Sequence, residues 1–301
     1  MPGSAEVAFD ALVIAPRGAL LGLTAVAFCL ALFTGAASLA VAWCLAFVVG
    51  DVVKVRRAHV EAAVERAGIA DAARVARGMY LSLARGVLEL VGMLFRGPER
   101  RLSEAFPWAR IEALRASSQG AVIATAHTGN WDLVACAVAS RMPLTVVTKR
   151  LHVRAADALW QRTRSRRGVR LVQAGGAARA AARALGAGEF VAMLVDQAPE
   201  RRRGAVRLPF LGAPAWVDLS PALCALRARS PLVVAFPRRL PGGAHTVEIA
   251  DVLTPPLHPT REWAVEAMTQ VTVLLERFVR EHPEQWLWMH RRWKGDEWSS
   301  T

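Results

Sequence analysis

Cysteine is scarce in this chain, and its spacing fits neither a metal site nor a redox pair. The 301 residues include four cysteines, Cys29, Cys44, Cys136 and Cys224. Structural metal sites and redox motifs place cysteines only about two to four residues apart. We therefore interpret all four as small apolar residues in a reducing compartment. No other cluster of metal-ligating residues stands out, so we expect neither a metal nor another cofactor.

A serine nucleophile and a nucleic-acid module are missing too. The sequence has no Gly-x-Ser-x-Gly motif, which places the nucleophilic serine of many hydrolases on a sharp turn. It has no recognisable nucleic-acid-binding motif and no internal repeat. These absences argue against an acyl-serine intermediate and against a modular nucleic-acid binder.

Charge is absent from one long segment near the N-terminus. From Gly18 to Gly50 there are 33 residues, and none is charged. A helix that crosses the hydrocarbon core of a bilayer needs about 20 apolar residues, so one span fits with residues left over. A single span and a re-entrant hairpin both remain open. A signal peptide is the alternative, but it would begin with basic residues, and Met1–Asp10 has none.

The charges beside this segment predict its orientation. Lys54, Arg56 and Arg57 follow it, whereas Arg17 alone stands directly before it. Because basic flanks stay on the cytoplasmic side, we expect the bulk of the chain there. We therefore divide the chain into an N-terminal membrane anchor at residues 1–58 and a second domain at residues 59–301.

Positive charge dominates the rest of the chain. The net charge is +13, and residues 141–207 contain 15 Lys and Arg against 4 Asp and Glu. Such a surface attracts an acidic protein, anionic lipid head groups or nucleic acid. A coding bias that favours arginine over lysine is the alternative explanation, although it accounts less well for the clustering.

Apolar strand-like runs alternate with helical patterns after residue 110. This alternation predicts an α/β fold with a largely parallel central sheet flanked by helices. The expected strands lie at residues 121–126, 144–148, 169–173, 190–195, 231–237 and 246–252.

A histidine follows the first expected strand and precedes an aspartate by five positions. His127 and Asp132 flank a Gly129–Asn130 turn, and Asn130 is placed to cap a helix from Trp131 to Ser140. Imidazole titrates near neutral pH, so His127 is a candidate general base, and Asp132 is a candidate for the carboxylate that orients it. A capping or surface pair is the alternative interpretation of this spacing.

Polar residues also end other expected strands. Asp196 and Gln197 follow one strand, Lys149 and Arg150 end a second, and Arg239 ends a third. In open α/β sheets, ligands bind at the carboxyl ends of the strands, so we expect these residues around one crevice. An apolar loop at residues 208–214 either lines a hydrocarbon channel or packs in the core.

Tryptophan is concentrated near the C-terminus. Five of the ten tryptophans lie between Trp263 and Trp298, mixed with arginines. Such a mixture suits a membrane interface. For Trp286 and Trp288, burial in the core is an equally good interpretation.

Several motifs in this order resemble the late acyltransferases of lipid A biosynthesis, a branch of the lysophospholipid acyltransferase-like enzymes. The resemblance covers roughly Arg74 to Lys294 and includes TKR at 148–150 and the Trp160–Arg164 run before Gly168. Its other motifs are HTGNWDL at 127–133, GEFVAMLVDQ ending at Gln197, PFLGAPA at 209–215 and EQWLWMHRRWK at 284–294.

The resemblance implies an inner-membrane enzyme whose catalytic domain faces the cytoplasm. It would move a fatty acyl chain from a thioester of acyl carrier protein, or of coenzyme A, to a hydroxyl of a lipid or glycolipid such as a lipid A precursor. His127 would be the general base and Asp132 its orienting partner. The other residues implied in the site, which would shape it, bind phosphates or stabilise the oxyanion, are Gly129, Asn130, Lys149, Arg150, Arg164, Asp196, Gln197 and Arg239.

Two departures from related patterns stand out. Asp132 occupies a position where many members of this branch have glutamate. Phe236–Pro237 is followed by Arg238, so the Phe-Pro-Glu-Gly motif of glycerolipid acyltransferases is missing. The alternative function is a non-catalytic, membrane-tethered binder of anionic lipid or nucleic acid, although no nucleic-acid partner is expected.

Overall fold

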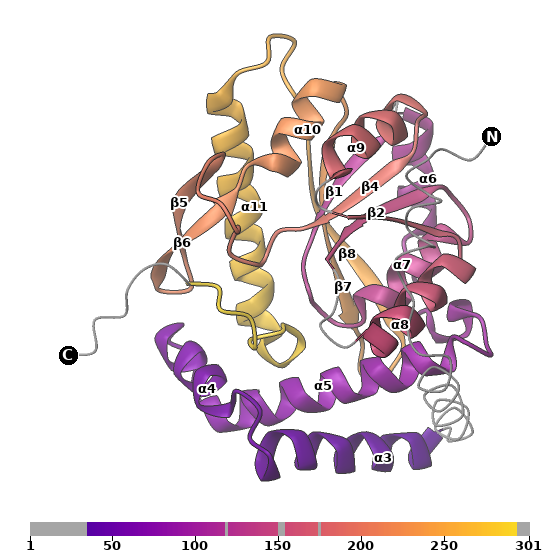
Figure 1. The fold of residues 1–301 in the computed structure, drawn as a ribbon, viewed down its shortest axis with the longest axis vertical. Helices are drawn as coiled ribbons and strands as arrows, with labels where there is room; N and C mark the ends of the chain where they lie inside the picture. Colours follow the sequence, from indigo (N-terminus) through magenta and orange to yellow (C-terminus); the bar gives the residue numbers. More distant parts are fainter. Residues whose placement is uncertain (1–34, 118–119, 150–153, 174–175, 294–301) are drawn as a thin grey trace.

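The computed structural model describes residues 35–117, 120–149, 154–173 and 176–293 (Figure 1). The strands of its central sheet are β1 (Ala121–Thr125), β2 (Leu144–Thr148), β3 (Val169–Gln173), β4 (Phe190–Leu194), β7 (Leu232–Arg239) and β8 (His245–Leu253). Their order is β3-β2-β4-β1-β7-β8. Neighbouring strands run parallel, except for β7 and β8, which are antiparallel. The predicted α/β fold with a largely parallel sheet is thus confirmed.

Helices cover both faces of this sheet (Figure 1). On one face lie α6 (Trp108–Ser117), α7 (Trp131–Ala139) and α8 (Arg154–Arg166). On the other lie α9 (Ala177–Gly186), α10 (Ser220–Ala228) and α11 (Arg261–Glu281). Because side chains alternate along a strand, Ile123 faces α7 whereas Val122 and Ala124 join the core under α10 and α11.

A separate hairpin decides between the two interpretations of the apolar loop. Residues 205–218 form the antiparallel strands β5 (Ala205–Phe210) and β6 (Ala213–Asp218). Phe210 and Leu211 are buried in the core, where Phe210 packs against Trp286 and Trp293. Of the two interpretations of the apolar loop, core packing is therefore confirmed.

The C-terminal tryptophans also belong to the core. Trp286, Trp288 and Trp293 are each almost fully buried, and they follow the short helix η4 (Pro283–Gln285). Trp298 lies outside the described residues. Core burial, rather than a membrane interface, explains Trp286, Trp288 and Trp293.

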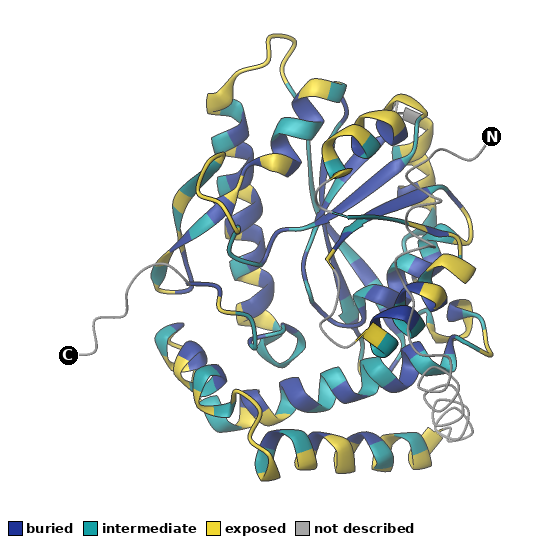
Figure 2. Ribbon diagram, in the orientation of Figure 1, coloured by how far each residue is buried: buried dark blue, intermediate teal, exposed yellow. Residues whose placement is uncertain are grey.

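One described helix is long and apolar enough to cross a membrane. The helix α3 (Gly35–Phe47) continues into the π-helix η1 (Val48–Val52), and only 17% of this 18-residue segment is buried. It packs along α5 (Ala72–Gly92), near α4 (Arg57–Arg66), and leaves apolar side chains such as Trp43 exposed (Figure 2). The first part of the predicted anchor, before residue 35, lies outside the described residues.

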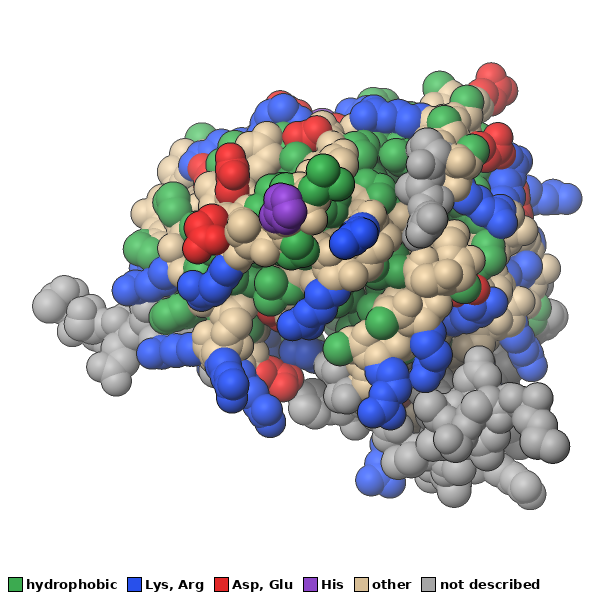
Figure 3. All heavy atoms as spheres, turned by 90° about the horizontal axis from the view of Figure 1, so that it is seen from above, with side chains coloured by type: hydrophobic (Ala, Val, Ile, Leu, Met, Phe, Trp, Pro, Cys, Tyr) green, Lys and Arg blue, Asp and Glu red, His purple; other side chains and the backbone are tan. Residues whose placement is uncertain are grey.

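Basic side chains are spread widely over the molecule. Figure 3 shows the face seen from above in Figure 1, opposite α5, with many Lys and Arg side chains and fewer acidic ones. Positive charge is therefore not restricted to the end of the sheet beside α5.

Candidate active site

The register of two parallel strands brings a histidine and an aspartate together. Thr125 at the end of β1 pairs with Leu194 at the end of β4. His127 and Asp196 each follow their strand by two residues, so they reach the same point beyond the carboxyl edge of the sheet. This is the edge where open α/β sheets bind ligands.

The His127 imidazole forms a hydrogen bond with the Asp196 carboxylate. Nδ1 of His127 lies 2.9 Å from Oδ1 and 3.2 Å from Oδ2 of Asp196. An ionised carboxylate only accepts hydrogen bonds, so Nδ1 carries the proton and Nε2 is left as the basic nitrogen. The side chain of His127 is 14% exposed, so the ring lies close to the surface.

Asp196 itself is fully buried and held by donors. Its Oδ2 accepts hydrogen bonds from the backbone N–H of His127 at 3.1 Å and from Trp286 Nε1 at 3.0 Å. Burial raises the pKa of Asp196, but the charge of His127 and the hydrogen bonds from its side chain and backbone outweigh it and hold that pKa below the usual value. The carboxylate therefore stays ionised.

Asp132 does not take the position expected for it beside His127. Its Oδ1 accepts from Arg164 Nε at 2.6 Å and from Nη2 at 2.5 Å, and both side chains are largely buried. Arg164 Nη1 also lies 3.4 Å from Thr148 Oγ1. Asp132, in the first turn of α7, thus forms an ion pair with Arg164 of α8. The carboxylate that is hydrogen-bonded to the His127 imidazole is that of Asp196.

The Gly129–Asn130 turn fixes the start of α7. Asn130 Oδ1 accepts from the Leu133 N–H at 3.0 Å, which confirms the predicted helix cap. Gly129 has φ of +51°, and a Cβ there would lie 2.7 Å from the Pro237 carbonyl oxygen, so glycine is required. The Gly129 N–H donates to the Gln285 carbonyl, so it is not available to an oxyanion.

A buried polar cluster supports this turn from behind. Asn130 Nδ2 donates to Oε2 of Glu89 in α5 at 2.8 Å. Glu89 also pairs with Arg239, and its Oε2 lies 3.1 Å from His245 Nε2. Burial raises the pKa of Glu89, but the hydrogen bond from His245 and the charge of Arg239 lower it further than burial raises it. Glu89 is therefore an ionised group at the centre of the cluster.

This cluster shows where Arg239 lies and adds two residues to the site. Arg239 is buried against Glu89 and does not form an exposed phosphate contact. Glu89 and His245 were not identified from the sequence. The signal for Glu89 was its position in an otherwise apolar stretch, Leu88–Val91, where a lone carboxylate needs a buried partner.

The remaining predicted residues lie at varied depths. Lys149 is half exposed and its Nζ lies 3.0 Å from Glu200 Oε1. The Gln197 side chain lies 3.1 Å from His290 Nε2. Arg150 lies outside the described residues.

His290 is a further site residue that sequence analysis assigned no catalytic role. Its ring centroid lies 4.7 Å from that of His127. Burial and the charge of His127 lower the pKa of His290 to about 4, so its ring is neutral at neutral pH. A neutral ring beside His127 adds no repulsion when His127 takes up a proton.

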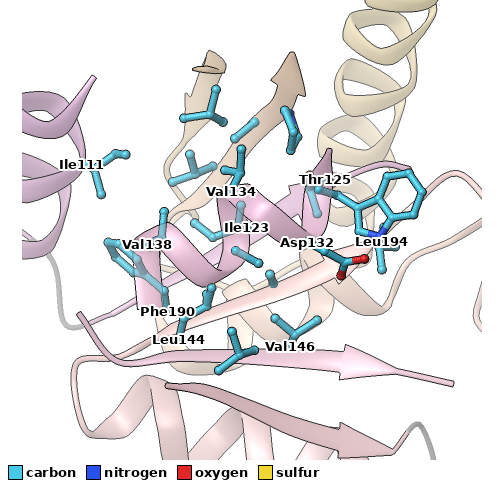
Figure 4. A pocket seen from close by; sticks show the side chains of 18 of the residues that line it. Ile111, Ile123, Thr125, Asp132, Val134, Val138, Leu144, Val146, Phe190 and Leu194 are labelled. Carbon is cyan, nitrogen blue, oxygen red and sulfur yellow. The ribbon is translucent and has the colours of Figure 1, made fainter. Parts of the chain in front are cut away.

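An apolar cavity lies between α7 and the sheet, next to this site. Its empty space is about 940 Å³, including the part that opens to solvent. Trp131, Asp132 and Arg164 line its end at the carboxyl edge, and apolar side chains of the sheet, α6 and α7 line the rest (Figure 4). The Trp131 ring contacts His127 edge-on, with centroids 5.0 Å apart. The cavity can hold a hydrocarbon chain whose polar end lies near His127.

Within the residues that the structure describes, no group of three or more His, Cys, Asp or Glu side chains could hold a metal ion. The chemistry available to the site is therefore built from one basic imidazole nitrogen, an ionised partner, a buried Arg164–Asp132 pair and an apolar cavity.

Comparison with known proteins identifies the family. A family model described as "Bacterial lipid A biosynthesis acyltransferase" matches residues 21–295. The match includes every site residue named above, and it confirms the resemblance inferred from the motifs. A search of curated proteins finds no match to the chain.

Proposed function

Because the chain belongs to the bacterial lipid A biosynthesis acyltransferase family, we propose that it transfers a fatty acyl chain from a thioester to a hydroxyl of a lipid A precursor. The observation that carries the proposal is the His127–Asp196 hydrogen bond beside an apolar cavity, with Trp131 lining the cavity and contacting His127. Acyl transfer to an alcohol requires a base and a hydrocarbon site close to each other.

His127 is the proposed general base. Its Nε2 takes the proton of the acceptor hydroxyl as the oxygen attacks the thioester carbonyl. The C–S bond then breaks, and the imidazolium gives this proton to the sulfur, which leaves as the carrier thiol. Asp196 holds the reactive tautomer and stabilises the imidazolium. Proton transfer of this kind contributes about 10²–10⁴-fold to the rate.

Arg164 is the proposed stabiliser of negative charge on the thioester oxygen. Its guanidinium lines the cavity end near Trp131 and is held by Asp132 at 2.5 Å, which limits its motion. Positioned donors need no reorganisation when charge develops, and this is often the largest contribution to catalysis.

Membrane association is part of the proposal. The apolar α3–η1 segment and the uncharged residues before it serve as the anchor, with the domain from residue 59 onward on the cytoplasmic side. The positive charge of the chain suits an acidic carrier protein or the phosphates of coenzyme A as donor.

The test uses the full chain in detergent with a tetraacylated disaccharide lipid A precursor. Dodecanoyl thioesters of acyl carrier protein and of coenzyme A are supplied separately, and products are measured by mass spectrometry. We expect an acceptor that gains one acyl mass with at least one donor. Thioester hydrolysis alone, or no reaction with either donor, would overturn the proposal.

A further inference from the structure

The two ends of the apolar cavity differ in chemistry. Figure 4 shows Thr125, Asp132 and Leu194 at one end, and Val138, Leu144 and Phe190 toward the other. The first end is polar and lies beside the Trp131 ring that contacts His127. A bound chain therefore enters at the Leu194 end and points toward Phe190.

Strand register places the residues of the far end in one row. Phe190 in β4 pairs with Ala121 on one side and with Leu144 in β2 on the other, and Leu144 pairs with Val169 in β3. Leu194 and Phe190 lie four residues apart on β4. At about 3.3 Å per residue, the cavity runs roughly 13 Å along this strand.

The far row is closed to solvent. Phe190 and Leu144 are each 4% exposed and Val169 is 3% exposed, and the buried Ile111 of α6 also lines the cavity. Phe190 has the largest side chain in this row. A chain that reaches its ring has no further space along the strand.

We propose that Phe190 forms the end wall of the acyl site and thereby limits the length of the fatty acid that the protein uses. This inference rests on the proposed function and names the substrate class more narrowly. Each carbon of an extended chain advances about 1.3 Å, so roughly ten methylene groups fit along the 13 Å of the cavity. The carbons between Leu194 and His127 add to this length, so the expected chain has more than about ten carbons.

Ala192 offers a second way to change the length. It lies midway between Phe190 and Leu194 on β4, lines the cavity, and has a side chain of one carbon. A larger residue at this position shortens the available space from within, while the end wall stays in place. The two positions therefore predict shifts of opposite sign.

The experiment measures kcat/KM for saturated acyl thioesters of 8 to 18 carbons with the full chain in detergent. We expect Phe190→Leu, and to a greater degree Phe190→Ala, to move the optimum two to four carbons longer. We expect Ala192→Leu to move it shorter and to reduce the rate with the wild-type optimum at least tenfold. Phe190→Leu provides the test if Phe190→Ala does not fold.

Phe236→Leu is the matched control. Phe236 is a fully buried phenylalanine on β7 that packs on Phe278, on the face of the sheet away from the cavity. It should lose stability as Phe190→Leu does, while its chain-length optimum stays that of the wild type. An unchanged optimum in folded Phe190→Leu and Ala192→Leu would overturn the inference, and so would an equal shift in Phe236→Leu.

A binding measurement separates this inference from the proposed function. Binding of saturated fatty acids of 8 to 18 carbons is followed by the shift in Tm, which requires no turnover. A length limit that moves with Phe190 supports the end wall even if no acyl transfer occurs. Acyl transfer whose length optimum does not respond to Phe190 or Ala192 supports the proposed function and overturns the end wall.

Discussion

The Nδ1 atom of His127 lies 2.9 Å from Oδ1 of Asp196, although 69 positions separate the two residues in the chain. The aspartate five positions after the histidine points instead to Arg164. The site therefore has two carboxylates with different partners, and these partners predict different consequences of substitution.

Asp196→Asn should reduce kcat by roughly 10²–10⁴-fold, because an amide neither fixes the required tautomer as well nor stabilises the imidazolium. Steady-state kinetics of the wild type and the variant would measure this loss.

Asp132→Asn is the comparison for that experiment. It weakens the hold on Arg164 and leaves the His127–Asp196 bond in place, so its loss in kcat should be smaller than that of Asp196→Asn. A larger loss in kcat for Asp132→Asn than for Asp196→Asn would show that Asp132 is the group that orients the base.

Glu89→Gln should destabilise the protein through Arg239. Both side chains are buried, and removal of one partner leaves an uncompensated charge, which costs about 3–5 kcal/mol. The double variant Glu89→Gln/Arg239→Met should recover much of this loss. Thermal unfolding of the three variants and the wild type measures the coupling, and additive losses would contradict it.

His290 should make the protein sensitive to mild acid. Its pKa is lowered from 6.5 to about 4 in the folded protein, so between these values the unfolded chain binds a proton that the folded chain does not. The contribution of neutral His290 to the free energy of unfolding is therefore fully present above about pH 6.5. It is lost as the pH falls toward 4, which lowers the free energy of unfolding by up to about 3 kcal/mol.

His290→Gln removes this titration. Its stability should decline less steeply than that of the wild type between pH 6.5 and pH 4.5 in denaturant unfolding. Equal slopes for the two proteins would show that His290 is not the responsible group.

Local patterns predict the fold well and the site only in part. The strands at residues 144–148 and 169–173 were predicted with the bounds observed, because short apolar runs between turn signals have few alternatives. The Asn130 cap was predicted too, since capping depends on residues three apart. These features are fixed by neighbours along the chain.

The partner of His127 could not be found in this way. The spacing of five residues along the chain favoured Asp132. Asp196 reaches His127 because β1 and β4 are neighbours in the sheet, and sequence patterns do not reveal the order of strands. Glu89 was missed for a related reason, because its partners Arg239 and His245 lie about 150 positions away.

The central claim is that His127 acts as a base, and the most direct measurement is the rate of acyl transfer by His127→Ala in detergent. His258→Ala, which removes an exposed histidine outside the site, is the control. With Tm showing that both variants are folded, we predict that His127→Ala loses at least about 10²-fold in kcat while His258→Ala keeps the wild-type rate. Acyl transfer by folded His127→Ala at the wild-type rate would contradict the account.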